Sequence, residues 1–89
     1  DDSQHAVYSY FRSAGGETLL IVLNLSNQKY RDYTLQFDRP TTLREIINSD
    51  TSKYGGRDVT NDWVIYSDER NCAQIMLAPL GSCIFRVSQ

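Results

Sequence analysis

Length, composition and charge exclude several classes of protein before any motif is considered. The chain has 89 residues, enough for one domain of two packed layers but too few for a (β/α)8 barrel, which takes roughly 200 residues or more. Its formal net charge is −2, with basic and acidic residues interspersed. It shows neither the basic stripe of a nucleic-acid-binding domain nor the basic amphipathic helix of a membrane-surface protein. We therefore expect no nucleic acid and no membrane among its partners.

Short apolar and β-branched runs along the chain predict strands rather than helices. Turn-forming residues separate these runs about every eight to twelve positions, which is typical of an antiparallel β-sandwich. The expected strands are His5 to Arg12, Thr18 to Ser26, Lys29 to Phe37, Thr42 to Asn48, Trp63 to Tyr66, Cys72 to Ala78 and Ser82 to Ser88. We expect an all-β fold, a small antiparallel β-sandwich with Greek-key links that forms a single domain over residues 1–89.

The strand expected at Thr18 to Ser26 is apolar on both faces. Side chains of a strand alternate between its faces, so Leu20 and Val22 share one face. The other face carries four more apolar residues, namely Leu19, Ile21, Leu23 and Leu25. A small antiparallel domain usually leaves one sheet face to water. We therefore expect this second face to be covered by something outside the chain.

The next strand, Lys29 to Phe37, shows the opposite pattern. Tyr33, Leu35 and Phe37 alternate there with polar residues, so we expect a half-buried strand with one wet face. Arg39 and Pro40 should end it, because proline lacks the N–H that a sheet ladder needs.

The last two strands flank Pro79-Leu80-Gly81, which predicts a hairpin turn. In that register Cys83 lies opposite Leu77, and Cys72 lies about 16 Å away at roughly 3.3 Å per residue. A disulfide needs Cα atoms within about 7 Å. We therefore expect two free thiols, which suits a reducing compartment such as the cytoplasm.

Three stretches, taken together, resemble one known family. They are Val22-Leu23-Asn24-Leu25-Ser26 followed by Tyr30-Arg31, then Leu43-Arg-Glu-Ile-Ile-Asn-Ser-Asp-Thr-Ser-Lys-Tyr-Gly-Gly56, and Leu77-Ala78-Pro79-Leu80-Gly81. In this order they resemble the C-terminal all-β domain of the α-amylase superfamily, most of all that of 1,4-α-glucan (glycogen) branching enzymes. The positions that match the family's central string are Arg44, Glu45, Asn48, Ser49, Asp50, Tyr54, Gly55, Gly56 and Asn61.

The chain departs from the branching-enzyme pattern in three places. Leu43 stands where the family often has Trp or Tyr, the loop that begins at Arg57 has less glycine than usual, and the segment before Cys72 is short. These departures leave open that the parent is another member of the superfamily, such as an amylase.

The resemblance implies a parent enzyme with an N-terminal catalytic barrel that carries the catalytic carboxylates. Such an enzyme would perform retaining transglycosylation on an α-1,4 glucan. The chain begins Asp-Asp-Ser without Met, so we expect a piece of a longer protein. It would be a non-catalytic domain that packs on the barrel, stabilises it and needs no cofactor. With an apolar face exposed, the excised domain could also self-associate weakly.

The long irregular segment Ser49 to Asp62 allows three readings. Its carboxylates Asp50, Asp58 and Asp62 could form a catalytic pair, but Asp and Asn in such segments more often form turns. Its oxygen-bearing residues could bind calcium, although their spacing matches no EF-hand; they are Asp50, Thr51, Ser52, Asp58, Asn61 and Asp62. His5, the only histidine, has no partner at ligand spacing and is expected on the surface. We expect turns, no catalytic residue and no metal.

Exposed aromatic rings suggest an alternative function, the binding of α-glucan. Aromatic rings bury much surface and suit the apolar faces of sugars. The candidates for glucan binding are Trp63, Tyr54 and Tyr66. Tyr30 is a weaker candidate, and Tyr33 shares a face with apolar residues and is expected in the core.

Two further expectations concern single features. An immunoglobulin-like domain would share the sandwich, but Trp63 precedes both cysteines, which is the wrong order for that family's core. Arg44 and Glu45 are neighbours on a strand and point to opposite faces. We expect both to be solvated unless one forms a salt bridge across the domain boundary.

Overall fold

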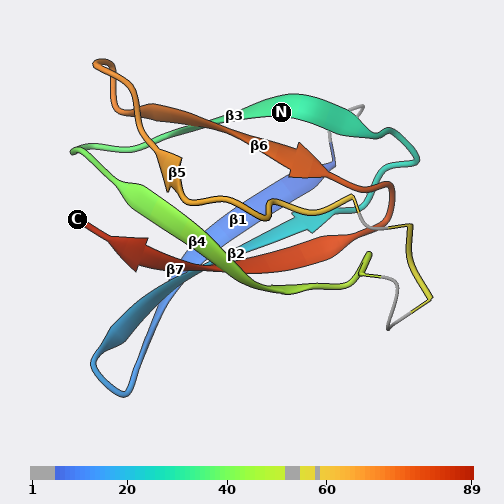
Figure 1. Ribbon diagram of the computed structural model, residues 1–89, viewed down its shortest axis with the longest axis horizontal. Helices are drawn as coiled ribbons and strands as arrows, with labels where there is room; N and C mark the ends of the chain where they lie inside the picture. Colours follow the sequence, from blue (N-terminus) through green and yellow to red (C-terminus); the bar gives the residue numbers. More distant parts are fainter. Residues whose placement is uncertain (1–5, 52–54, 58) are drawn as a thin grey trace.

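The computed structural model describes residues 6–51, 55–57 and 59–89, and within them every regular element is a strand (Figure 1). The seven strands are β1 (Val7–Ala14), β2 (Glu17–Asn24), β3 (Tyr30–Gln36), β4 (Thr42–Asn48), β5 (Ile65–Tyr66), β6 (Cys72–Leu77) and β7 (Ser82–Ser88). The expected all-β fold is confirmed. The described part of the chain contains no helix that is long and apolar enough to cross a membrane.

The strands form two antiparallel sheets. The larger sheet has the order β1-β2-β7-β4-β5, and the smaller one pairs β3 with β6 (Figure 1). The chain passes between the sheets after β2, β3, β5 and β6, which gives the expected sandwich with crossing connections.

The expected hairpin of the last two strands is wrong. β6 pairs with β3, whereas β7 lies between β2 and β4 in the other sheet. The connection turns sharply at Leu80, whose φ is 53°, and carries the chain from one sheet to the other. The alternation of apolar and polar residues predicted which side chains face the core. The same alternation occurs whether two strands pair in one sheet or face each other from two sheets, so it could not reveal the partners of β6 and β7.

A two-residue turn at Gly15 and Gly16 joins β1 to β2. Both glycines have positive φ, 56° and 81°, which is the requirement of the type I′ turn that matches the twist of a hairpin. The turn therefore fixes the register of β1 on β2, with Tyr10 opposite Ile21.

The core lies between the two sheets. Leu20 and Val22 of β2 face it, as does Leu35 of β3, so the expected alternation of these strands is confirmed. Tyr33 packs against the same cluster, as predicted. The cluster comprises Leu20, Val22, Leu35, Phe37, Leu43, Ile65, Ala73, Ile75, Leu77, Cys83, Phe85 and Val87.

Both cysteines are free, as predicted, although the reason differs from the expected one. Cys72 lies on β6 and Cys83 on β7, in different sheets rather than far apart along one hairpin. Burial, and to a lesser degree the negative charge of Glu45, raises the pKa of Cys83 to about 12. The Cys83 thiol is therefore neutral at physiological pH and behaves as a small apolar core residue.

Candidate functional site

The outer face of the five-stranded sheet, which points away from the core, carries a row of apolar side chains. The strand registers place Tyr10 opposite Ile21, Ile21 opposite Ile84, and Ile84 opposite Ile47. We call these four residues the apolar row. Tyr10 and Ile47 at its ends are 47% and 50% exposed, and Tyr8 beside it is 57% exposed. The row crosses four strands and is open to water mainly at its two ends.

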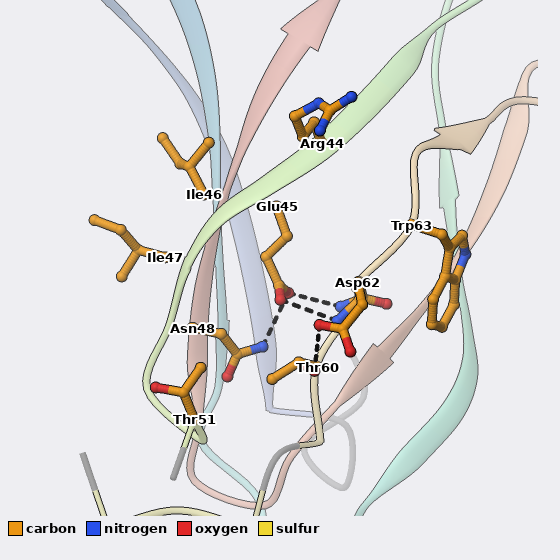
Figure 2. A pocket seen from close by; sticks show the side chains of 10 residues that line it. Arg44, Glu45, Ile46, Ile47, Asn48, Thr51, Thr60, Asp62 and Trp63 are labelled. Carbon is orange, nitrogen blue, oxygen red and sulfur yellow. Dashed lines mark hydrogen bonds between the residues drawn. The ribbon is translucent and has the colours of Figure 1, made fainter. Parts of the chain in front are cut away.

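A β-bulge enlarges this outer face at β4. Glu45 lies opposite Phe85 and Ile47 opposite Ile84, so Ile46 is an extra residue in β4. Figure 2 shows Ile46 and Ile47 on the side of β4 opposite to Glu45. Two successive isoleucines thus point outward, which simple alternation would not allow.

The second face of β2 is uncovered in part, as the sequence indicated. Leu19 and Leu23 are half-buried there, whereas Ile21 is shielded by its neighbours in the sheet. Leu25 lies beyond the end of β2 at Asn24 and is exposed.

Asn24 itself is fully buried, and its Nδ2 donates to the carbonyl oxygens of Gln28 and Ala78.

On the other side of β4, Glu45 is at the centre of a hydrogen-bond network (Figure 2). Its carboxylate accepts from Asn48 Nδ2 at 2.9 Å, from the backbone N–H of Asn61 at 2.9 Å and from Asn61 Nδ2 at 2.8 Å. The expectation that Glu45 is solvated is therefore wrong, whereas Arg44 is exposed as expected. The sequence contained both asparagines but no signal that one carboxylate would bind them.

Asn61 connects the two sheets. Its Nδ2 also donates to the carbonyl oxygen of Met76 at 3.1 Å, and its Oδ1 accepts from the N–H of Met76 at 2.8 Å. The Asn61 amide therefore forms with Met76 of β6 the pair of hydrogen bonds that a neighbouring strand would form. The same side chain also donates a hydrogen bond to Glu45 of β4. Only 2% of Asn61 is exposed, so these bonds replace water that cannot reach the site.

The described part of the segment between β4 and β5 is closed by its own polar residues. Asp50 Oδ2 accepts from the N–H of Val59 at 2.7 Å, and Asn48 Nδ2 donates to the carbonyl of Val59 at 3.2 Å. Asp62 Oδ1 accepts from the Thr60 hydroxyl at 2.9 Å. Asp50 thus lies in a turn and bonds the backbone, as expected, whereas the bond of Asp62 is to a side chain and does not test the turn-forming role expected for it.

Some of the residues in the calcium-binding and catalytic hypotheses are not among those that the structure describes. His5, Ser52 and Asp58 lie outside the described residues. Among those that are described, no three His, Cys, Asp or Glu side chains gather into a group that could hold a metal ion.

Of the three aromatic candidates for glucan binding, Trp63 borders a hollow of about 250 Å³. We call this the Trp63 hollow. The indole is 53% exposed and stands beside Asp62, on the same side of β4 as Glu45 (Figure 2). The lining residues are Arg44, Glu45, Ile46, Ile47, Asn48, Thr51, Thr60, Asn61, Asp62 and Trp63.

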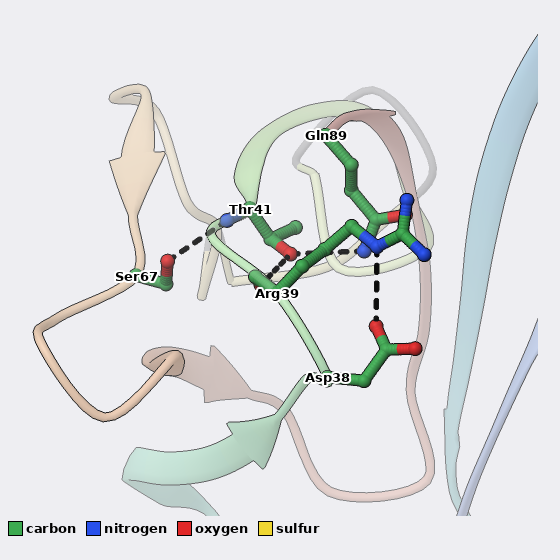
Figure 3. Close-up of polar contacts among 5 residues, drawn as sticks. All are labelled: Asp38, Arg39, Thr41, Ser67 and Gln89. Carbon is green, nitrogen blue, oxygen red and sulfur yellow. Dashed lines mark hydrogen bonds and ion pairs between the residues drawn. The ribbon is translucent and has the colours of Figure 1, made fainter.

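Tyr66 borders a different hollow, of about 320 Å³, and Tyr54 lies outside the described residues. The wall of the Tyr66 hollow is held by Thr41, whose N–H donates to Ser67 Oγ at 2.9 Å and whose hydroxyl accepts from Gln89 Nε2 at 3.0 Å (Figure 3). The structure therefore does not bring Trp63 and Tyr66 into one hollow.

Comparison with known proteins agrees with this architecture. The family model described as "Alpha amylase, C-terminal all-beta domain" matches residues 1–88. The chain belongs to this family. The expectation drawn from the three sequence stretches is thereby confirmed.

Relatives of the chain include bacterial proteins named 1,4-alpha-glucan branching enzyme GlgB. The protein from Protochlamydia amoebophila is 35% identical over 98% of this chain and 12% of its own length. That from Synechococcus sp. strain CC9605 is 33% identical over 97% of this chain and 12% of its own length. GlgB 2 of Xanthomonas euvesicatoria pv. vesicatoria is 40% identical over 68% of this chain. The chain thus spans about one eighth of the first two relatives.

Proposed function

We propose that this domain of the alpha-amylase family is the non-catalytic C-terminal domain of an α-glucan-acting enzyme, most similar to 1,4-α-glucan branching enzymes. In this proposal the outer face of its five-stranded sheet packs on the catalytic barrel and stabilises it. The observation that carries it is the apolar row Tyr10, Ile21, Ile84 and Ile47, which this chain leaves partly open to water. Most of the length of the relatives lies outside the region matched here, which is consistent with a partner surface elsewhere in such an enzyme.

A non-catalytic role is supported by how the carboxylates are used. Glu45 is occupied by three hydrogen bonds, and Asp50 closes its own loop. Retaining glycosidases instead need two carboxyl groups about 5–5.5 Å apart across a substrate cleft. Glu45 and Asp50 thus serve as structural groups, and we place the chemistry in the rest of the enzyme.

Lysines on the apolar row test this proposal. In the full-length enzyme, Tyr10→Lys with Ile47→Lys should detach the domain, because burying unpaired ammonium groups in an apolar interface costs several kcal/mol. In the 89-residue chain the same pair should change the free energy of unfolding by less than about 1 kcal/mol, since both positions are half exposed. Limited proteolysis and thermal melting report both effects.

The matched control places two lysines on the outer face of the small sheet, at Thr34 and Gln74. These residues are exposed and lie opposite each other on β3 and β6. We expect this pair to leave the full-length enzyme intact. If both lysine pairs leave the melting curve of the full-length enzyme unchanged, the packing role is wrong.

A second candidate function is the binding of α-glucan at the Trp63 hollow. It is favoured by an exposed indole that borders a hollow and is carried on a fixed segment. Asn61, two residues before Trp63, is held by Glu45 and Met76, and Ile65, two residues after it, is buried opposite Leu43. A ring held in place in this way loses little freedom when a sugar stacks on it. Titration with maltoheptaose tests this function.

A further inference from the structure

A row of arginines lies beside the apolar row on the outer face. The registers place Arg12 opposite Leu19, Leu19 opposite Arg86, and Arg86 opposite Arg44. We call Arg12, Arg86 and Arg44 the arginine row. It runs parallel to the apolar row, two residues from it on β1 and β7 and, because of the bulge at Ile46, three residues from it on β4. The two rows are thus about 7 Å apart. The two rows therefore form one surface that a single partner would cover.

The positive charge of this face is only partly neutralised within the chain. Arg86 Nε lies 3.4 Å from Glu17 Oε2, and both side chains are 48% exposed. Among the described residues, Arg12 and Arg44 form no ion pair. The strand positions of this face thus carry three arginines and one glutamate, a formal charge of +2, whereas the whole chain has −2.

The pairing of Arg44 with Arg86 is unfavourable in the isolated domain. They lie directly opposite each other on neighbouring antiparallel strands, where like charges are destabilising. Covering this face with an uncharged surface would strip water from the guanidinium groups and make the cost larger. A carboxylate offers the guanidinium two parallel hydrogen bonds and removes the repulsion.

We propose that the catalytic barrel presents one or more carboxylate side chains to Arg44 and Arg86, next to apolar side chains that cover the apolar row. This inference rests on the proposed packing function and names the chemistry of the partner surface. A second copy of the chain suits the face poorly, because the same face of that copy carries the same positive charge.

The test is a neutral substitution whose effect should have opposite signs in two contexts. In the 89-residue chain, Arg44→Gln removes a repulsion and should raise the hydrogen-exchange protection of β7 by up to about twofold. In the full-length enzyme it should lower that protection by about tenfold, because a charge-assisted hydrogen bond is lost. The same β7 peptides can be followed by mass spectrometry in both proteins.

Arg31→Gln is the matched control. Arg31 is exposed on β3, in the other sheet, so its loss should leave protection unchanged in both contexts. One molar salt should shrink the effect of Arg44→Gln in the 89-residue chain, because that repulsion is exposed to solvent.

The outcomes separate this inference from the function on which it rests. If Arg44→Gln changes protection in the same direction in both proteins while Tyr10→Lys with Ile47→Lys still detaches the domain, the domain packs on the barrel but the carboxylate partner is wrong. If the lysine pair also has no effect, both proposals fall. Opposite signs for Arg44→Gln, together with detachment by the lysine pair, support both.

Discussion

Replacing Asn61 by alanine should lower the free energy of unfolding of the 89-residue chain by about 3–5 kcal/mol. The change removes three part-buried hydrogen bonds of the Asn61 side chain, one to Glu45 and two to the backbone of Met76. Each buried group left without a partner costs about 1–3 kcal/mol. Because the bonds join the two sheets, the loss should appear as reduced stability of the whole domain in chemical denaturation.

Asp62→Ala is the matched control, one residue along the chain. Asp62 is exposed, and from the described residues it accepts one hydrogen bond, from Thr60. Its loss should cost less than about 1 kcal/mol. Equal losses for the two variants would contradict the role of Asn61 as the link between the sheets.

Maltoheptaose at millimolar concentration should change the fluorescence of Trp63, and the change should saturate. Trp63 is the only tryptophan of the chain, so the signal reports this ring alone. In native gels containing glycogen, Trp63→Ala should lose retardation, with affinity reduced at least about tenfold, because stacking and the burial of the indole are both lost. Asp62→Asn should weaken retardation less, since it keeps an oxygen that can accept from a sugar hydroxyl.

Tyr66→Ala and a β-linked sugar serve as controls for this binding. Tyr66 borders the other hollow, so its loss should leave retardation unchanged. Cellohexaose should not change the Trp63 fluorescence if the hollow fits an α-linked chain. Unchanged fluorescence with maltoheptaose and equal retardation of Trp63→Ala and the unsubstituted chain would exclude the glucan site.

The sequence predicted the sandwich because alternation and turn chemistry are local. The strands β4 (Thr42–Asn48) and β7 (Ser82–Ser88) have the expected ends. Gly15 and Gly16 join β1 to β2 in a tight turn, where positive φ suits glycine. The partner strands of β6 and β7 could not be predicted in this way, because they depend on contacts with distant strands rather than on the connecting turn.

The candidate site was predicted only in part. The five successive apolar residues from Leu19 to Leu23 indicated an outer face that needs cover. The bulge at Ile46 and the two hydrogen bonds from Asn61 to Glu45 were not predictable, because each depends on contacts between different segments of the chain. Tyr8 and Tyr10 lie two residues apart in the first expected strand and therefore share a face. Phe11 lies on the opposite face, so the aromatic pattern alone did not show which face points outward.

Hydroxyl-radical footprinting of Tyr8 and Tyr10 tests the packing of this domain most directly. Both rings are about half exposed on the outer face of the five-stranded sheet in the 89-residue chain. Trp63, on the other side of β4 from Ile47, is the internal reference (Figure 2). The proposed packing predicts that oxidation of Tyr8 and Tyr10 falls severalfold relative to Trp63 when the domain is part of the full-length enzyme. Oxidation of both tyrosines at the same relative rate in the two proteins would contradict it.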